Sequence, residues 1–315
     1  MIMEWGYLLI LLNSVLMCVM TAIRKEYQRK VDATLKTTLV FMGISSLFVC
    51  LIGIGYCIYT DFALIKQADG FVLGLSSVFA IILTVNTCLC IFGAKYGSLA
   101  MITTFATLGT LVISTIYGLI SDPLKNKLSV FNVLGLCLAV VIIALGFIAN
   151  KSQEHQEDRN EQKKSKFFIF ICLAVFIFNG SALSVYSIFT SNRADYGGFN
   201  FIFLYLFFCV LICALMLGIL FACSKRSKKD FIIKNYLIGK PLLCSLLYGI
   251  VFFGAEFFAL TTTSILPIVI QAPLSFAMNV VIVAIADYLI YKQKLTKLEW
   301  LQIALAVVSG VFFAL

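Results

Sequence analysis

Charged residues are scarce in this chain. Only 12% of its 315 residues are Asp, Glu, Lys or Arg, whereas 62% are hydrophobic. Soluble domains carry about 25% charged residues. A soluble core could not absorb so much apolar surface, so we expect an integral membrane protein with the lipid bilayer as its solvent. The formal charge is +9, but the basic residues lie in short segments between apolar runs. That pattern excludes a nucleic-acid-binding module and is typical of membrane-protein loops.

Several functional motifs are also missing. The only histidine, His155, lies in a polar stretch where we expect a solvated side chain, so the usual general base and metal ligand are absent from the apolar runs. The chain has no P-loop, no Gly-x-Ser-x-Gly motif and no potassium-filter sequence. We therefore expect no catalytic residues, no metal and no cofactor. The 11 cysteines lack zinc-ligand or redox-motif spacing, and we interpret them as small hydrophobic residues.

Long apolar runs dominate what is present. A membrane-spanning helix needs about 20 largely apolar residues, and its backbone polar groups must be satisfied within the helix. The chain is therefore predicted to be an all-α protein of the cell membrane with ten transmembrane helices. The predicted spans are residues 5–23, 38–59, 71–94, 98–120, 131–149, 167–190, 199–222, 241–260, 265–287 and 298–315.

The two halves of the chain echo each other. A basic segment at 125–129 precedes the sequence LAVV at 138–141, and a similar segment at 292–296 precedes LAVV at 305–308, an offset of 167 residues. We predict two five-helix repeats, residues 1–149 and 167–315, joined by a polar linker at 150–166. Because five is odd, the second repeat would enter the membrane from the opposite side, as in an inverted-topology repeat.

Lys and Arg are distributed unevenly between the two expected faces. The segments after the first, third, fifth, seventh and ninth spans carry 20 of them, and the opposite face carries four. The positive-inside rule then places the richer face in the cytoplasm and both termini outside.

The second half resembles a known family. The polar segment 261–264 is predicted to form a short turn within an apolar hairpin. This hairpin, followed by Pro267 and by the Leu295-Thr296 turn before a Leu/Ala/Val helix, is similar to the EamA-type repeat of the drug/metabolite transporter superfamily. The resemblance implies ten helices in two inverted repeats, a central cavity and alternating access. It also implies termini inside, and both orientations stay open. Gln293 and Asn126 stand where many members carry Glu, so no carboxylate role is carried over to this turn.

Two asparagines occupy matching places in the halves. Asn13 and Asn179 are 166 residues apart and both fall inside predicted spans. Inverted repeats place such positions on opposite walls of a midplane cavity. Two amides would suit a polar or zwitterionic solute. The alternative is that each amide bonds a neighbouring helix.

Glu256 is the only acid well inside a span, about four residues before its expected end. A carboxylate there suits proton coupling or a cationic group of a solute. The alternative is that its side chain reaches the membrane interface. We expect no buried Lys or Arg beside it.

Four further polar side chains are candidate solute contacts, although packing contacts are the more common role for each: Asn86, Tyr186, Gln271 and Asn279. Two prolines are candidate hinges. Pro273 lies inside its span and should bend or break the helix, whereas Pro267 fits a first helical turn.

These features favour a secondary transporter for a small organic metabolite or drug, working by alternating access with proton coupling or exchange. One alternative is a membrane enzyme acting on lipid-linked substrates, with Asp61, Asp69, Asp122 and Asp287 as its only carboxylates. Another is a sensor or assembly protein without a solute-sized cavity. The identity of the solute, the coupling ion and the oligomeric state are open.

Overall fold

In the computed structural model, which describes residues 2–31, 34–59, 66–93, 99–121, 129–154, 159–223, 239–291 and 297–314, the chain folds into long α-helices. The described residues form no β-strand, which confirms the all-α class. The elements are α1 (Ile2–Lys30), α2 (Leu35–Tyr59), α4 (Gly70–Gly93), α5 (Leu99–Ser121), α6 (Val130–Glu154), α7 (Arg159–Arg193), η1 (Ala194–Tyr196), α8 (Gly198–Cys223), α9 (Lys240–Ile265), α10 (Ile268–Tyr291) and α11 (Lys297–Ala314).

Seven helices among the described residues are long and apolar enough to cross a membrane: α1, α2, α4, α5, α7, α8 and α9. Shorter apolar stretches occur at Val133–Ile142 in α6, Ile268–Asn279 in α10 and Ile303–Phe312 in α11. Large apolar side chains also face outward, including Leu51 (57% exposed) and Phe170 (66% exposed). A soluble protein would bury such residues, so the chain is a multi-pass membrane protein.

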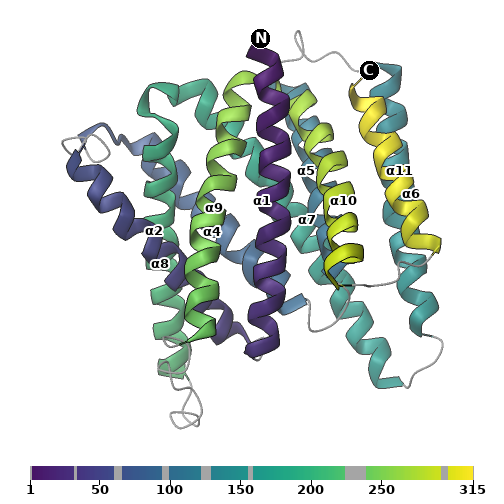
Figure 1. Ribbon diagram of the computed structural model, residues 1–315, viewed down its shortest axis with the longest axis horizontal. Coiled ribbons are helices and arrows are strands. Elements are labelled where there is room, and N and C mark those ends of the chain that lie inside the picture. Colours follow the sequence, from purple (N-terminus) through teal and green to yellow (C-terminus); the bar gives the residue numbers. More distant parts are fainter. Residues whose placement is uncertain are drawn as a thin grey trace.

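The helices pack as a bundle in which α1 contacts α9 and α10, and α7 contacts α4 and α5. Figure 1 shows α2 and α8 on one side of these helices, and α6 and α11 on the other. The two termini lie at the same end of the molecule (Figure 1).

Two close helix contacts define that end. A Cβ on Gly6, near the start of α1, would lie 2.8 Å from Leu266, which directly follows α9. A Cβ on Gly198, where α8 begins, would lie 3.0 Å from Leu260 near the end of α9. The start of α1, the junction of α7 with α8 and the end of α9 therefore meet at the terminal end of the molecule.

The polar segment 261–264, which we expected to form a turn, lies inside α9. Each of its three threonines donates a hydrogen bond to the carbonyl oxygen four residues earlier, at 2.7–2.8 Å. The hydroxyls thereby find partners without leaving the helix, so the expected turn was wrong. The chain turns instead at Leu266 and Pro267, and the carbonyl oxygen of Pro267 accepts bonds from the first turn of α10.

Other boundaries differ less from the expectation. Helix α1 continues to Lys30, well past residue 23, and most of the expected linker 150–166 lies in α6 and α7. Pro273 does not break α10, which runs unbroken around it, although it cannot donate to the carbonyl oxygen of Val269. Residues 122–128 and 292–296, with the basic segments, Asp122, Asn126 and Gln293, lie outside the described residues, as do Asp61 and His155.

An aromatic core fills the space between α4, α7 and α8. The rings of Phe79 and Tyr205 meet edge to face with centroids 4.7 Å apart, and Phe79 and Tyr186 lie 4.8 Å apart. The rings of Phe189 and Phe201 stack at 4.1 Å. This packing fixes Tyr186, whose hydroxyl belongs to the site described next. The ten cysteines with described side chains are thiols and form no disulfides.

Candidate functional site

A cavity of about 100 Å³ lies inside the bundle. One side, the first wall, is formed by α1, α9 and α10, and the other side, the second wall, by α5 and α7 with α4 behind them. The first wall contributes Asn13, Met17, Ala255, Glu256, Ala259, Gln271, Ser275, Phe276 and Asn279. The second wall contributes Thr107, Thr110, Asn179, Ala182, Leu183 and Tyr186. A cavity of this size holds several waters or a small organic molecule.

The polar groups of α10 reach the cavity because of their spacing. Gln271, Ser275 and Asn279 are four residues apart, so they lie above one another on one face of the helix. The sequence indicated the shared face of Gln271 and Asn279, and Ser275 completes the row.

Gln271 is almost fully buried, with 1% of its surface exposed. Its amide nitrogen donates to the carbonyl oxygen of Ala259 at 3.0 Å. No described residue donates a hydrogen bond to its Oε1. Rotating the amide by half a turn would place Oε1 against the carbonyl oxygen of Ala259, and two acceptors cannot share a hydrogen bond. The contact with Ala259 therefore fixes Oε1 as the acceptor without a described donor.

Glu256 lies deeper than the sequence suggested. Because α9 continues to Ile265, the carboxylate is nine residues before the helix end, about 14 Å at 1.5 Å per residue. It lines the cavity and accepts a short hydrogen bond from the hydroxyl of Tyr186 across the two walls. The Tyr186 hydroxyl also lies 3.4 Å from that of Tyr205. The side chain therefore belongs to an interior polar network, not to the membrane interface.

The second wall is bound together by Asn179. Its amide nitrogen donates to the carbonyl oxygen of Ala106 and to the hydroxyl of Thr110, both at 2.9 Å. Its amide oxygen accepts a bond of 2.9 Å from the side chain of Asn86 on α4. One side chain thus links α4, α5 and α7, with a partner for each of its polar groups.

Close backbone contact brings α5 and α7 near enough for these hydrogen bonds to form. A Cβ on Gly109 would overlap the carbonyl oxygen of Phe176, and a Cβ on Gly180 would overlap the backbone of Gly109. Ser114 also donates to the carbonyl oxygen of Gly180 at 3.3 Å. Small residues permit this approach, as they do in many membrane helix pairs.

The matching asparagines therefore lie on opposite walls, as expected, but in different states. Asn179 is enclosed by its partners, whereas Asn13 presents a buried Oδ1 to which no described residue donates. The Oδ1 atom of Asn279 is likewise buried and without a described donor. Of the seven side chains expected at the site, six line the cavity and Asn86 supports it from behind. Their roles toward a solute stay predictions.

Sequence reasoning did not place a basic residue near the site. Arg24 had been assigned to the basic turn after the first span, but it lies within α1 and is half-buried. Its Nε donates to the Tyr248 hydroxyl at 3.1 Å, its Nη2 makes a shorter bond to the same oxygen, and the guanidinium carbon lies 5.1 Å from the Tyr248 ring centroid. Tyr248 is eight residues before Glu256 on α9, about 12 Å along the helix. Arg24 and Tyr248 form what we name the α1–α9 clasp.

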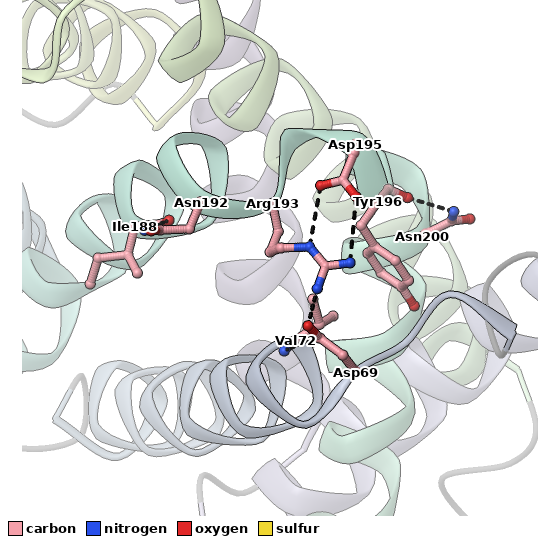
Figure 2. Close-up of polar contacts among 8 residues, drawn as sticks. All are labelled: Asp69, Val72, Ile188, Asn192, Arg193, Asp195, Tyr196 and Asn200. Carbon is pink, nitrogen blue, oxygen red and sulfur yellow. Dashed lines mark hydrogen bonds and ion pairs between the residues drawn. The ribbon is translucent and has the colours of Figure 1, made fainter.

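A second clasp joins α4 and α7 at the terminal end. Figure 2 shows Arg193, at the end of α7, between Asp195 and Asp69. Its Nη1 makes a short ion pair with Asp69, and its Nε lies 3.2 Å from Asp195. Asp69 also caps α4, because its carboxylate accepts from the amide of Val72 at 2.9 Å. This α4–α7 clasp and the α1–α9 clasp lie on opposite sides of the cavity along the bundle axis.

Three features of the site escaped sequence reasoning. The hydroxyls of Thr107 and Thr110 bond carbonyl oxygens of their own helix, so nothing in their spacing marks them. Ser275 could have been found from the four-residue spacing on α10. The Arg24–Tyr248 pair needed knowledge of which helices are neighbours, since the two residues are 224 apart in sequence.

Comparisons with known proteins bear on the fold alone. No family model matches the sequence, and no curated protein matches it. Among solved structures, a protein known from a crystal structure matches over 98% of this chain and 96% of its own, with a TM-score of 0.61 at 13% identity. That likeness spans nearly both whole chains, so the bundle as a whole is a fold that occurs in another protein.

Proposed function

We propose that this protein is a secondary transporter that binds a small organic solute in the cavity between the two walls and releases it by alternating access. The observation that carries the proposal is a cavity within a membrane bundle that is lined by Glu256 and several amide and hydroxyl side chains, with buried acceptor oxygens that no described residue satisfies. Such groups are costly in lipid, so they are retained where a ligand or function uses them.

The proposal includes ten transmembrane helices arranged as two inverted repeats, as in the drug/metabolite transporter superfamily that the sequence resembles. The helix neighbours support this arrangement. α1 packs on α9 and α10 as α7 packs on α4 and α5. Exchanging each helix with the one five places along the chain converts the first wall into the second. The same exchange turns each of the contacting pairs α2–α8 and α6–α11 into itself.

Glu256 is the proposed coupling residue. It lies between the walls and is bound to Tyr186 from the opposite side, so a change in its proton or solute occupancy would alter a contact between the halves. Pro267 and Pro273 are the proposed hinge positions, at the start and within the first turns of the helix that carries Gln271 and Asn279.

An enzyme acting on lipid-linked substrates is less well supported. Of its four candidate carboxylates, only Asp69 has a described side chain, and that side chain caps α4 and pairs with Arg193. A sensor without a cavity is also less well supported, because the cavity is present.

The test is transport by the purified full chain in proteoliposomes, with a panel of cationic, zwitterionic, neutral and anionic metabolites. We expect at least one solute to accumulate without ATP, and a pH gradient to change its flux. Replacing Glu256 with Gln should lower that flux about a hundredfold, equivalent to about 2.7 kcal/mol.

Glu26→Gln is the matched control, because this carboxylate is about half-exposed near the end of α1 and pairs with Arg29 and Lys30. It should transport at the wild-type rate. If no solute in the panel moves faster than in protein-free liposomes, the transporter proposal is wrong. If Glu256→Gln retains the full response to the pH gradient, Glu256 is not the coupling residue.

A further inference from the structure

We propose that the cavity selects small primary-amine cations, molecules that carry a positive charge and several N–H donors on one nitrogen. This inference rests on the proposed transport function and names the solute class. It follows from which hydrogen-bonding groups of the cavity are already used and which are left open.

Several donors of the cavity are committed to the protein. The Tyr186 hydroxyl donates to Glu256, the Asn179 amide to Ala106 and Thr110, and the Gln271 amide to Ala259. The hydroxyls of the lining threonines donate to backbone carbonyls of α5. These particular donors are therefore not available to a solute that needs to accept hydrogen bonds.

Three acceptor oxygens of the first wall have no hydrogen-bond donor among the described residues. No described residue donates to Oδ1 of Asn13, Oε1 of Gln271 or Oδ1 of Asn279, although all three atoms are buried. The three side chains line the same cavity from α1 and α10. A buried acceptor without a donor is destabilising, and a ligand with several N–H groups would supply the missing donors.

The charge of the cavity has one sign. Glu256 is the only ionisable acid among the lining residues, and no Lys or Arg lines it. The nearest arginine identified above, Arg24, is held by the Tyr248 hydroxyl and ring outside the lining. Its positive charge interacts with Glu256 electrostatically but makes no described ion pair with it. A carboxylate with one short bond from Tyr186 retains acceptor capacity for a second donor. Three neutral acceptors with one carboxylate match an ammonium group, whose three N–H donors point in different directions.

The experiment measures binding to the detergent-solubilised full chain by isothermal titration with four probes of similar size: n-butylammonium, butyltrimethylammonium, n-butanol and butyrate. The quaternary probe keeps the charge and removes the N–H donors, and the alcohol keeps a donor and removes the charge. We expect n-butylammonium to bind at least tenfold more tightly than either, a difference of about 1.4 kcal/mol, and butyrate to bind least.

Substitutions of cavity residues then test whether n-butylammonium binds in the cavity. Glu256→Gln and Gln271→Met should each weaken n-butylammonium binding about tenfold, equivalent to about 1.4 kcal/mol. The matched control is Gln28→Met on α1, whose amide donates to Ile91 at 3.2 Å outside the cavity lining, and it should bind as the wild type does. The four-probe series on the wild-type chain needs no variant, so a variant that fails to fold leaves the test intact.

Equal affinity for the primary and the quaternary cation would overturn the role of the open acceptors. Tightest binding of butyrate or of n-butanol, or no binding of any probe, would overturn the amine class. In those cases, transport of another solute class in the proteoliposome panel would leave the transporter proposal standing. Absence of both binding and transport would remove both proposals.

Discussion

The two walls of the cavity leave their polar groups in different states. In the second wall, Asn179 bonds Asn86, Ala106 and Thr110, so its amide is fully used. In the first wall, Asn13 and Gln271 each present an amide oxygen to which no described residue donates. A fully satisfied network contributes rigidity, whereas an open one is available to a ligand. In the proposed transporter, the second wall would therefore support the site, and the first wall would offer contacts to a solute.

The helix contacts follow the same division. α5 and α7 approach closely at Gly109 and Gly180, where an added Cβ would overlap backbone atoms. In the first wall, a Cβ on Gly254 of α9 would lie 3.2 Å from a side-chain atom of Leu16 on α1. The approach of α1 to α9 at Gly254 is therefore limited by a side-chain end, whereas α5 and α7 meet backbone to backbone.

The largest effect is expected from Gly109→Ala. The new methyl group would overlap the carbonyl oxygen of Phe176, so α5 and α7 must separate. We expect a loss of about 3 kcal/mol in the free energy of unfolding, at the upper end for overpacking, measured by denaturation of the full chain in detergent. Gly74→Ala is the control, since no atom lies within 4 Å of its added Cβ. Equal stability of the two variants would contradict the rigid second wall.

A smaller effect is expected from Asn179→Ala. It removes three hydrogen bonds and leaves Asn86 and Thr110 without their interhelical partner. Such bonds in membranes contribute about 0.6–2 kcal/mol each, and we expect a total loss of about 2 kcal/mol in the free energy of unfolding. The measurement is the same denaturation experiment.

Asn13→Ala is the matched substitution on the first wall. Its amide oxygen has no described donor, so the free energy of unfolding should change by less than about 0.5 kcal/mol. Affinity for the transported solute should fall about tenfold, or about 1.4 kcal/mol. If Asn13→Ala destabilises the chain as much as Asn179→Ala does, the walls do not differ in the way proposed.

The smallest effect is expected from Arg193→Gln in the α4–α7 clasp. The Arg193 side chain is 24% exposed and that of Asp69 is 46% exposed. Exposed ion pairs contribute about 0–1 kcal/mol and are screened by salt. We expect a loss of less than about 1 kcal/mol in the free energy of unfolding, which shrinks further at high salt. A loss of stability that does not depend on salt would instead indicate that the Arg193–Asp69 ion pair is shielded from solvent.

The candidate side chains could be predicted because polar groups stand out in apolar spans. Asn13, Asn179, Glu256 and Gln271 were all found in this way, and six of the seven candidates line one cavity. Their partners could not be predicted, because Asn86 lies 93 residues from Asn179 and Tyr186 lies 70 residues from Glu256. The turn expected at 261–264 was wrong because hydroxyl side chains can bond carbonyl oxygens of their own helix, and a composition-based boundary does not register that.

The sequence by itself determined that the chain is a helical membrane protein and which polar side chains lie within its spans. The physical reason is that lipid satisfies no backbone or side-chain polar group, so apolar length and isolated polar residues are direct signals. Only the tertiary structure decided which of those side chains are satisfied by the protein and which are open to a ligand. Helix neighbours determine the available donors and acceptors, and in this chain those neighbours come from distant segments: Asn179 finds its partners on α4 and α5, while Gln271 and Asn13 keep their oxygens free at the cavity.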